Sequence, residues 1–127
     1  LPLIQYTTRH LMGRQIAGQL VRQGLRPSHR FELDSYAAIM AMVADGAGWT
    51  ILTPLGWMAV PQFRDRVSIL PLTLPPFARQ ISLVSRNGAL GEMPVQIARR
   101  LRALLQTHLV QPAVAAEAWL APGLRVL

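Results

Sequence analysis

Short apolar runs alternate with helical segments along the first 53 residues, and this order restricts the fold more than any other feature of the sequence. Residues 1–6, 30–33 and 49–53 are rich in β-forming side chains and are expected to be strands. Residues 9–25 repeat apolar side chains every four positions, which predicts a helix with one buried face. Residues 35–45 are mostly apolar, as in a helix that is buried nearly all round. This β-α-β-α-β order predicts an α/β fold with a mostly parallel sheet flanked by helices.

The pattern is looser in the rest of the chain. Residues 55–63 are expected to form one or two helical turns, and residues 67–70 and 80–86 a fourth and a fifth strand. Residues 93–110 carry apolar side chains along one side and predict an amphipathic helix. Residues 111–127 are rich in Ala and Pro and are expected to contain a short helix followed by a tail.

Composition excludes several classes of protein. The chain has 127 residues, 51% of them hydrophobic, which is enough for one domain core and too many for a disordered protein. It has no cysteine, and so no disulfide, thiolate metal site or cysteine nucleophile. No signal-like segment is visible at the start, so the chain is not expected to be a secretory precursor, and the missing start Met indicates a fragment. A cytoplasmic location is expected. The uncharged residues 46–63 contain three glycines and two prolines, so they predict a buried strand and loop, and no membrane span is expected.

The formal net charge of +7 raises the question of nucleic-acid binding. All 13 basic residues are Arg, and they are scattered along the chain except around residues 99–102. No aromatic residues are interleaved with them, so a solvated surface is the more common explanation than a nucleic-acid groove.

Polar residues follow each of the three strands predicted in the first half of the chain. Together with the proline that follows the last of them, they form a set of seven: Thr7, Thr8, Arg9, Asp34, Ser35, Thr53 and Pro54. Ligands of open α/β sheets bind beyond the carboxyl ends of the strands, beside helix N-termini that favour anions. We therefore expect a small-molecule site there, formed by these residues. Thr8 and Ser35 are also typical helix N-caps, and for either residue alone capping is the more common explanation.

No catalytic, metal or cofactor motif is present. The chain lacks the G-x-S-x-G sequence of serine hydrolases, and its three histidines lack the spacing of metal ligands. Its six acidic residues are scattered, and Gly46-x-Gly48 precedes a strand where a phosphate loop would open a helix. We therefore do not expect the chain to be an enzyme or to bind a metal or cofactor.

The segment LDSYAAIMAMVADGAGWTILTP, residues 33–54, resembles the effector-binding region of the LysR-type transcriptional regulators. In that family an acidic residue and Ser or Thr open a helix, as at Asp34-Ser35 here, and V-A-x-G-x-G follows, as at residues 43–48. An apolar strand closed by Pro comes next, as at residues 49–54. LPLIQYTTRHLMGRQI is similar to the start of the family's second regulatory subdomain, and ARQISLVSRNG to its returning strand. The resemblance covers residues 1–110.

The resemblance implies a fold like that of the type 2 periplasmic binding proteins, with one lobe and a return segment present. Residues 1–86 would be effector-binding subdomain II, residues 87–110 the closing helix of subdomain I, and residues 111–127 a C-terminal tail. The first half of subdomain I and the family's winged helix-turn-helix are missing. The last helix is therefore expected to pack on a neighbouring chain or to rearrange, because its apolar side lacks its usual partner.

The resemblance also implies function. The chain would sense a small, anionic metabolite in a cleft between lobes, with the seven residues named above as one wall. It would oligomerise as a dimer or tetramer and contact DNA only through a domain outside this chain. Two alternatives remain at this point: a fragment of a solute-binding protein of a transport system, and a module that binds DNA directly through its positive charge.

Overall fold

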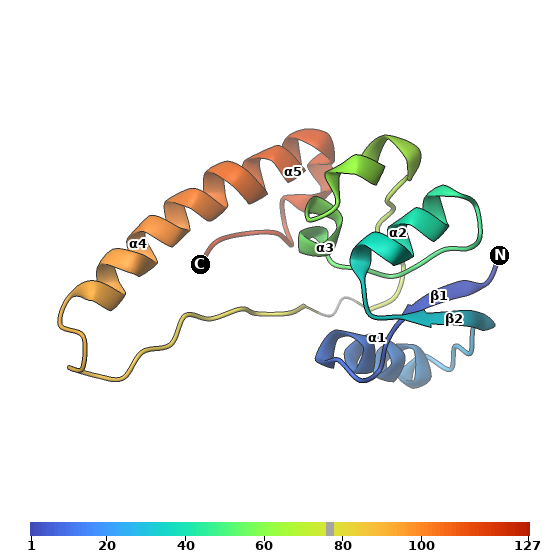
Figure 1. Ribbon diagram of the computed structural model, residues 1–127, viewed down its shortest axis with the longest axis horizontal. Helices are drawn as coiled ribbons and strands as arrows, with labels where there is room; N and C mark the ends of the chain where they lie inside the picture. The colour runs from blue at the N-terminus through green and yellow to red at the C-terminus, as the bar shows by residue number, and fades with distance from the viewer. Residues whose placement is uncertain (76–77) are drawn as a thin grey trace. The chain divides into compact units, whose positions relative to one another are not determined.

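The computed structural model describes residues 1–75 and 78–127 and divides into two compact units, Leu1–Pro76 and Phe77–Leu127 (Figure 1). The first unit contains β1 (Leu3–Tyr6), α1 (Leu11–Arg22), β2 (His29–Leu33), α2 (Tyr36–Ala44), α3 (Pro54–Met58) and the 3₁₀ helix η1 (Pro61–Arg66). The second contains α4 (Met93–Leu105), the π-helix η2 (Gln106–Val110), α5 (Gln111–Ala116) and the 3₁₀ helix η3 (Ala118–Leu120).

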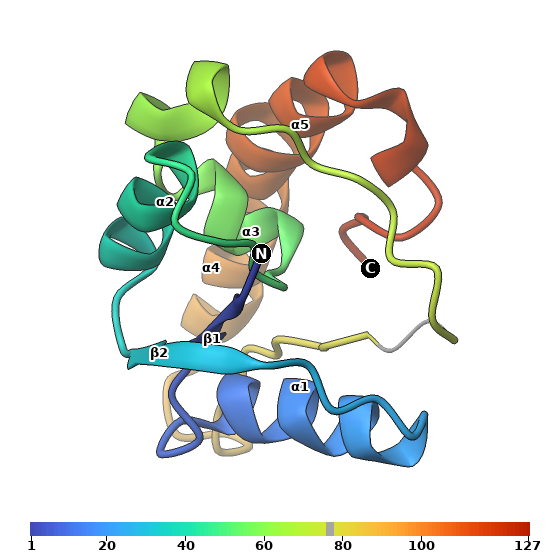
Figure 2. The same cartoon turned by 90° about the vertical axis from the view of Figure 1, so that its right-hand side faces the viewer.

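The first unit is built on the parallel pair β1–β2, in which Tyr6 lies opposite Leu33. Helix α1 lies on one side of this pair and α2 on the other, as Figures 1 and 2 both show. The α/β class and the parallel pairing predicted from the sequence are confirmed, and both crossing helices begin within two residues of the predicted positions.

The apolar stripe predicted for α1 packs against β1. Met12, Ile16 and Leu20 of the helix form one core cluster with Leu3 of the strand. Burying each such side chain contributes about 1.5–3 kcal/mol. Contact is close because α1 carries Gly13 in its first turn, where a Cβ atom would collide with the backbone carbonyl oxygens of Tyr6 and Thr7. The start of α1 is thus held against the carboxyl end of β1.

The third strand predicted over residues 49–53 is reduced to one parallel bridge between Leu3 and Trp49. Ile4 N donates to Trp49 O at 2.8 Å, and Trp49 N donates to Pro2 O at 3.1 Å. The next residue uses its side chain, because Thr50 Oγ1 donates to Ile4 O at 2.8 Å. A side-chain hydroxyl therefore takes the carbonyl that a continuing ladder would use, and the pairing ends there.

The fourth and fifth predicted strands, residues 67–70 and 80–86, are not strands within the described part of the chain. A strand requires a neighbour whose backbone completes its hydrogen bonds. Residues 80–86 instead expose their apolar side chains, with Ile81 at 67% and Val84 at 85% exposure. The alternation of apolar residues indicates a tendency to form a strand. It does not indicate whether a neighbouring strand is available to pair with it.

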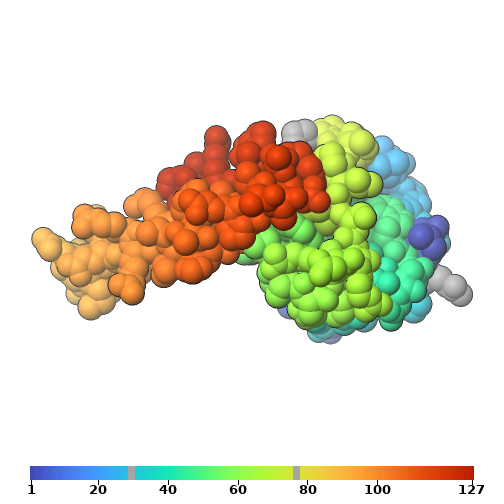
Figure 3. All heavy atoms as spheres, turned by 90° about the horizontal axis from the view of Figure 1, so that it is seen from above, coloured from blue at the N-terminus to red at the C-terminus, as the bar shows by residue number. Residues whose placement is uncertain are grey.

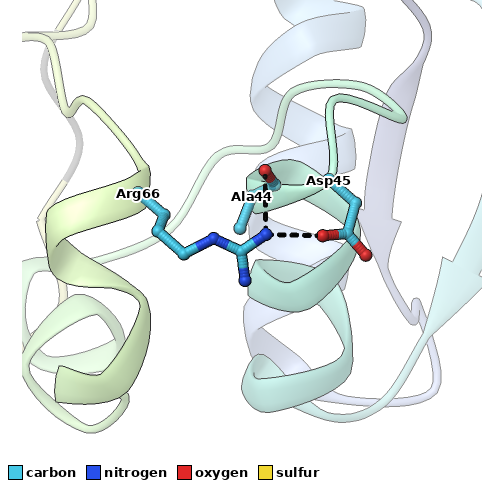
Figure 4. Close-up of polar contacts among 3 residues, drawn as sticks. All are labelled: Ala44, Asp45 and Arg66. Carbon is cyan, nitrogen blue, oxygen red and sulfur yellow. Dashed lines mark hydrogen bonds and ion pairs between the residues drawn. The ribbon is translucent and has the colours of Figure 1, made fainter.

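In the first unit, η1 is held to α2 and α3 by its arginines. Arg66 Nη2 lies 2.7 Å from Asp45 Oδ1 and 3.5 Å from Ala44 O, at the end of α2 (Figure 4). The Arg64 guanidinium lies over the ring of buried Trp57, 5.6 Å from its centroid. The short helical turns predicted over residues 55–63 are found as α3 and the start of η1.

In the second unit, the helix predicted over residues 93–110 is found, but it changes type before its end. Helix α4 covers Met93–Leu105 and then widens into the π-helix η2. Pro112 lies just beyond, and proline has no N–H to donate to the carbonyl four residues earlier. The wider turn accommodates this loss before α5 resumes the α-helical path.

None of the side chains of α4 is buried within the described residues. Its surface can be followed in Figure 3, where its atoms are drawn in orange. The C-terminal tail returns to it, since Arg102 Nε donates to Leu127 O at 3.0 Å. Of the helices in residues 1–75 and 78–127, none is both long and apolar enough to cross a bilayer.

Candidate functional site

The residues that follow β1 and β2 leave the sheet at the same edge. Tyr6 and Leu33 lie opposite each other at the strand ends, and Thr7 N donates to Leu33 O at 2.8 Å. Thr7, Thr8 and Arg9 therefore start beside Asp34 and Ser35. This arrangement was expected from the sequence, because parallel strands end at a common edge.

The residues Thr53 and Pro54 approach this edge through α3. Thr53 Oγ1 accepts a hydrogen bond from Gly56 N at 3.2 Å, and Pro54 is the first residue of α3. A Cβ atom on Gly56 would lie 2.8 Å from the ring of Tyr36, the first residue of α2. The start of α3 therefore packs against the start of α2.

Glu32 is the residue at this edge that the sequence analysis missed. Its Oε1 accepts hydrogen bonds from Thr7 Oγ1 at 2.7 Å, from Thr8 N at 3.0 Å and from Thr8 Oγ1 at 3.4 Å. The available signal was its position one residue before the end of β2, where alternation separates it from Phe31 and Leu33. A carboxylate at this position faces the residues that follow the neighbouring strand, here Thr7 and Thr8.

Arg9 and Arg14 hold the loop between β1 and α1. Arg9 donates to Thr7 Oγ1 from its backbone N at 3.3 Å and from Nε at 3.4 Å. Arg14 Nη1 donates to Arg9 O at 3.0 Å and to Thr8 O at 3.3 Å. The edge thus carries the positive charges of Arg9 and Arg14 and the negative charges of Glu32 and Asp34.

Helix capping explains part of the predicted set. Ser35 Oγ accepts from Ala38 N at 3.4 Å and caps α2, and Thr53 caps α3 in the same way. Thr8 does not cap α1, because the N-cap residue is His10, which makes no capping hydrogen bond with its side chain. Thr8 instead directs its N–H and hydroxyl to Glu32.

Two hollows in the described part of the chain lie away from the strand ends. The larger, about 570 Å³, is lined by residues between Gln106 and Val126. The smaller, about 230 Å³, is lined by Glu92, Val95, Gln96 and Arg99. Neither includes any of the seven predicted residues. Over residues 1–75 and 78–127, no group of three or more His, Asp or Glu side chains is placed to hold a metal ion.

Comparison with known proteins identifies a family and a curated relative. The family described as the LysR substrate binding domain matches residues 1–110. The "Hydrogen peroxide-inducible genes activator" of Dickeya chrysanthemi is 34% identical over 110 residues, a match that covers 84% of this chain and 35% of the relative. The chain therefore spans about a third of the length of this relative. No solved structure matches the chain significantly.

Proposed function

The chain belongs to the LysR substrate-binding domain family, and we propose that it is the effector-sensing part of a LysR-type transcriptional regulator. Domains of this family have the periplasmic-binding-protein-like fold and are not enzymes, in agreement with the fold and the lack of catalysis predicted from the sequence. In this assignment residues 1–86 are subdomain II, residues 87–110 are the closing helix of subdomain I, and residues 111–127 are a tail.

The effector binds at the edge where β1 and β2 end. What supports this proposal is the hydrogen bond from Thr7 N to Leu33 O, which brings the two strand ends together in a fold whose ligands bind at this edge. Thr7, Thr8, Arg9, Asp34, Ser35, Thr53 and Pro54 form this lobe's wall of the site. The opposite wall of the cleft belongs to another part of the protein.

The effector carries negative charge. Arg9 supplies a guanidinium at the edge, and the first turn of α1 has N–H groups that no N-cap side chain engages. Helix N-termini favour anions for this reason. Asp34 opposes an anion, so the negative group is expected on the Arg9 side of the site.

The relative from Dickeya chrysanthemi is named for genes that hydrogen peroxide induces. The most reactive protein group toward peroxide is a cysteine thiolate, and this chain has no cysteine. Reversible binding of a small molecule is the form of sensing that these residues support.

The whole regulator is proposed to be a cytoplasmic dimer or tetramer that contacts DNA through a domain outside these residues. Effector binding would favour one arrangement of the sensor domains over another and so reposition the DNA-binding domains. Such coupling requires the effector to bind the two states with different affinity.

A thermal-shift screen of the intact regulator tests this proposal. A panel of small carboxylates is expected to contain a compound that raises the melting temperature, because a ligand that binds only the folded state stabilises it. Thr8→Val and Arg9→Gln should each weaken binding about tenfold, the effect of losing one hydrogen bond to a charged group. Thr107→Val and Arg100→Gln, both exposed in the second unit, are the matched controls. Unchanged affinity in both edge variants would refute the placement of the site.

A further inference from the structure

Three hydrogen-bond donors converge on one oxygen atom at the edge described above. Thr7 Oγ1, Thr8 N and Thr8 Oγ1 lie 2.7, 3.0 and 3.4 Å from Glu32 Oε1. All three donors belong to consecutive residues at the end of β1, whereas the acceptor comes from β2. The carboxylate of Glu32 is thus held by donors from the neighbouring strand end.

The hydroxyl of Thr7 is oriented for this role. Thr7 is only 2% exposed, and its Oγ1 accepts hydrogen bonds from Arg9 N and Arg9 Nε. A hydroxyl has one hydrogen and two acceptor positions. Because Arg9 uses the acceptor positions, the hydrogen is left to point at Glu32. The adjacent guanidinium of Arg9 makes the surroundings more favourable for a negative charge.

A backbone N–H and two hydroxyls directed at one oxygen are a donor set suited to a carboxylate, and a carboxylate already occupies it. We propose that Thr7 and Thr8 form a carboxylate-binding subsite, and that Glu32 fills it until the carboxylate of an effector displaces it. This inference rests on the proposed function, because it assigns a chemical class to the effector of the same edge.

Displacement of Glu32 from Thr7 and Thr8 is feasible because Glu32 is an exposed residue, so its carboxylate stays hydrated when it leaves them. A tethered group competes at an effective concentration of about millimolar, so its presence lowers the apparent affinity for a free carboxylate. Only molecules that also gain contacts with Arg9 or α2 would then bind at low concentration. Glu32 therefore determines specificity by excluding simple carboxylates.

The test uses acetate as the probe and the intact regulator as the sample. Melting temperature is measured against sodium acetate, with sodium chloride replacing it at constant ionic strength. Glu32→Ala is expected to lower the acetate concentration needed for a given rise in melting temperature about tenfold, by removing the tethered competitor. Glu32→Gln should give a smaller decrease, because a neutral amide still accepts from the same donors but more weakly. This second variant also serves if Glu32→Ala does not fold.

Two controls separate a site from a general charge effect. Glu92→Gln removes the same charge from the second unit and should leave the acetate response unchanged. Adding Thr7→Val to Glu32→Ala removes the hydroxyl from the subsite and should abolish the gain. Equal acetate responses in the wild type and both Glu32 variants would overturn the proposal, as would an equal gain in Glu92→Gln.

The outcomes also distinguish this inference from the proposed function. Suppose that a metabolite binds through Thr8 and Arg9, but that the Glu32 variants respond to acetate as the wild type does. Glu32 is then not a tethered competitor, and the effector site stands. If acetate gains affinity in the Glu32 variants but no metabolite binds, the carboxylate subsite stands and the sensing proposal fails.

Discussion

The rings of Tyr6 and Tyr36 stack with their centroids 4.9 Å apart and their planes inclined by 24°. Tyr6 is the last residue of β1 and Tyr36 the first residue of α2, so this pair joins the two strand exits that form the candidate site. Gly56 of α3 packs on the same Tyr36 ring. One aromatic pair therefore sets the spacing of three chain segments.

Tyr36→Ala is expected to lower the free energy of unfolding by about 1–3 kcal/mol, since a stacked pair is worth about 0.5–1.5 kcal/mol beyond its buried area. Urea denaturation measures the change. Tyr36→Phe keeps the ring and should remain within about 0.5 kcal/mol of the wild type, the usual range for a change that removes no packing. A large loss in Tyr36→Phe would mean that the hydroxyl carries the contact.

Gly13→Ala tests the close contact between α1 and the end of β1. Its Cβ would collide with the carbonyl oxygens of Tyr6 and Thr7, which are backbone atoms, so α1 must shift away. We expect a loss of about 2 kcal/mol or more, as for other overpacked positions.

Gly18→Ala is the control in the same helix. The nearest atom to its Cβ would be Arg22 Nη1 at 3.4 Å, the end of a flexible side chain. Alanine is favoured over glycine by about 0.5–1 kcal/mol inside a helix, so this variant should be more stable than the wild type. Equal effects of the two substitutions would contradict the contact.

Ser35→Ala removes the cap of α2, in which Ser35 Oγ accepts from Ala38 N. The expected loss is about 1 kcal/mol, with recovery in Ser35→Asp, because both Ser and Asp are good N-caps. Chemical denaturation measures both variants. A ligand-binding defect in Ser35→Ala that Ser35→Asp does not restore would indicate a role for the hydroxyl beyond capping.

Local patterns predicted the parts of the fold that depend on local interactions. The spacing of apolar residues predicted the buried stripe of α1 and the apolar helix α2. The alternation of strands and helices along the chain predicted the parallel pairing. Strands at residues 49–53 and 80–86 depend on partners distant in sequence, and their alternation carried no information on whether those partners exist. Within the described part of the chain, residues 49–53 therefore form only the bridge at Trp49, and residues 80–86 remain unpaired with Val84 exposed.

The candidate site shows the same division. The strand-end position of Thr7, Thr8 and Ser35 was predictable, because any parallel pair ends at one edge. The convergence on Glu32 was not, since it depends on which way a side chain near the end of β2 points and on the loop geometry set by Arg9.

Pro112→Ala tests whether proline causes the π-helical turn. The new N–H at residue 112 would donate to His108 O, and α4 would then continue into α5 as one α-helix. A proline inside a helix costs about 3 kcal/mol relative to alanine, so even partial relief should slow amide exchange across residues 106–112 at least about tenfold. Hydrogen–deuterium exchange measures this protection. Pro94→Ala is the matched control, because Pro94 lies in the first turn of α4, where the N–H has no partner within the helix. If exchange across residues 106–112 slowed in Pro94→Ala but not in Pro112→Ala, the π-helical turn would have another cause.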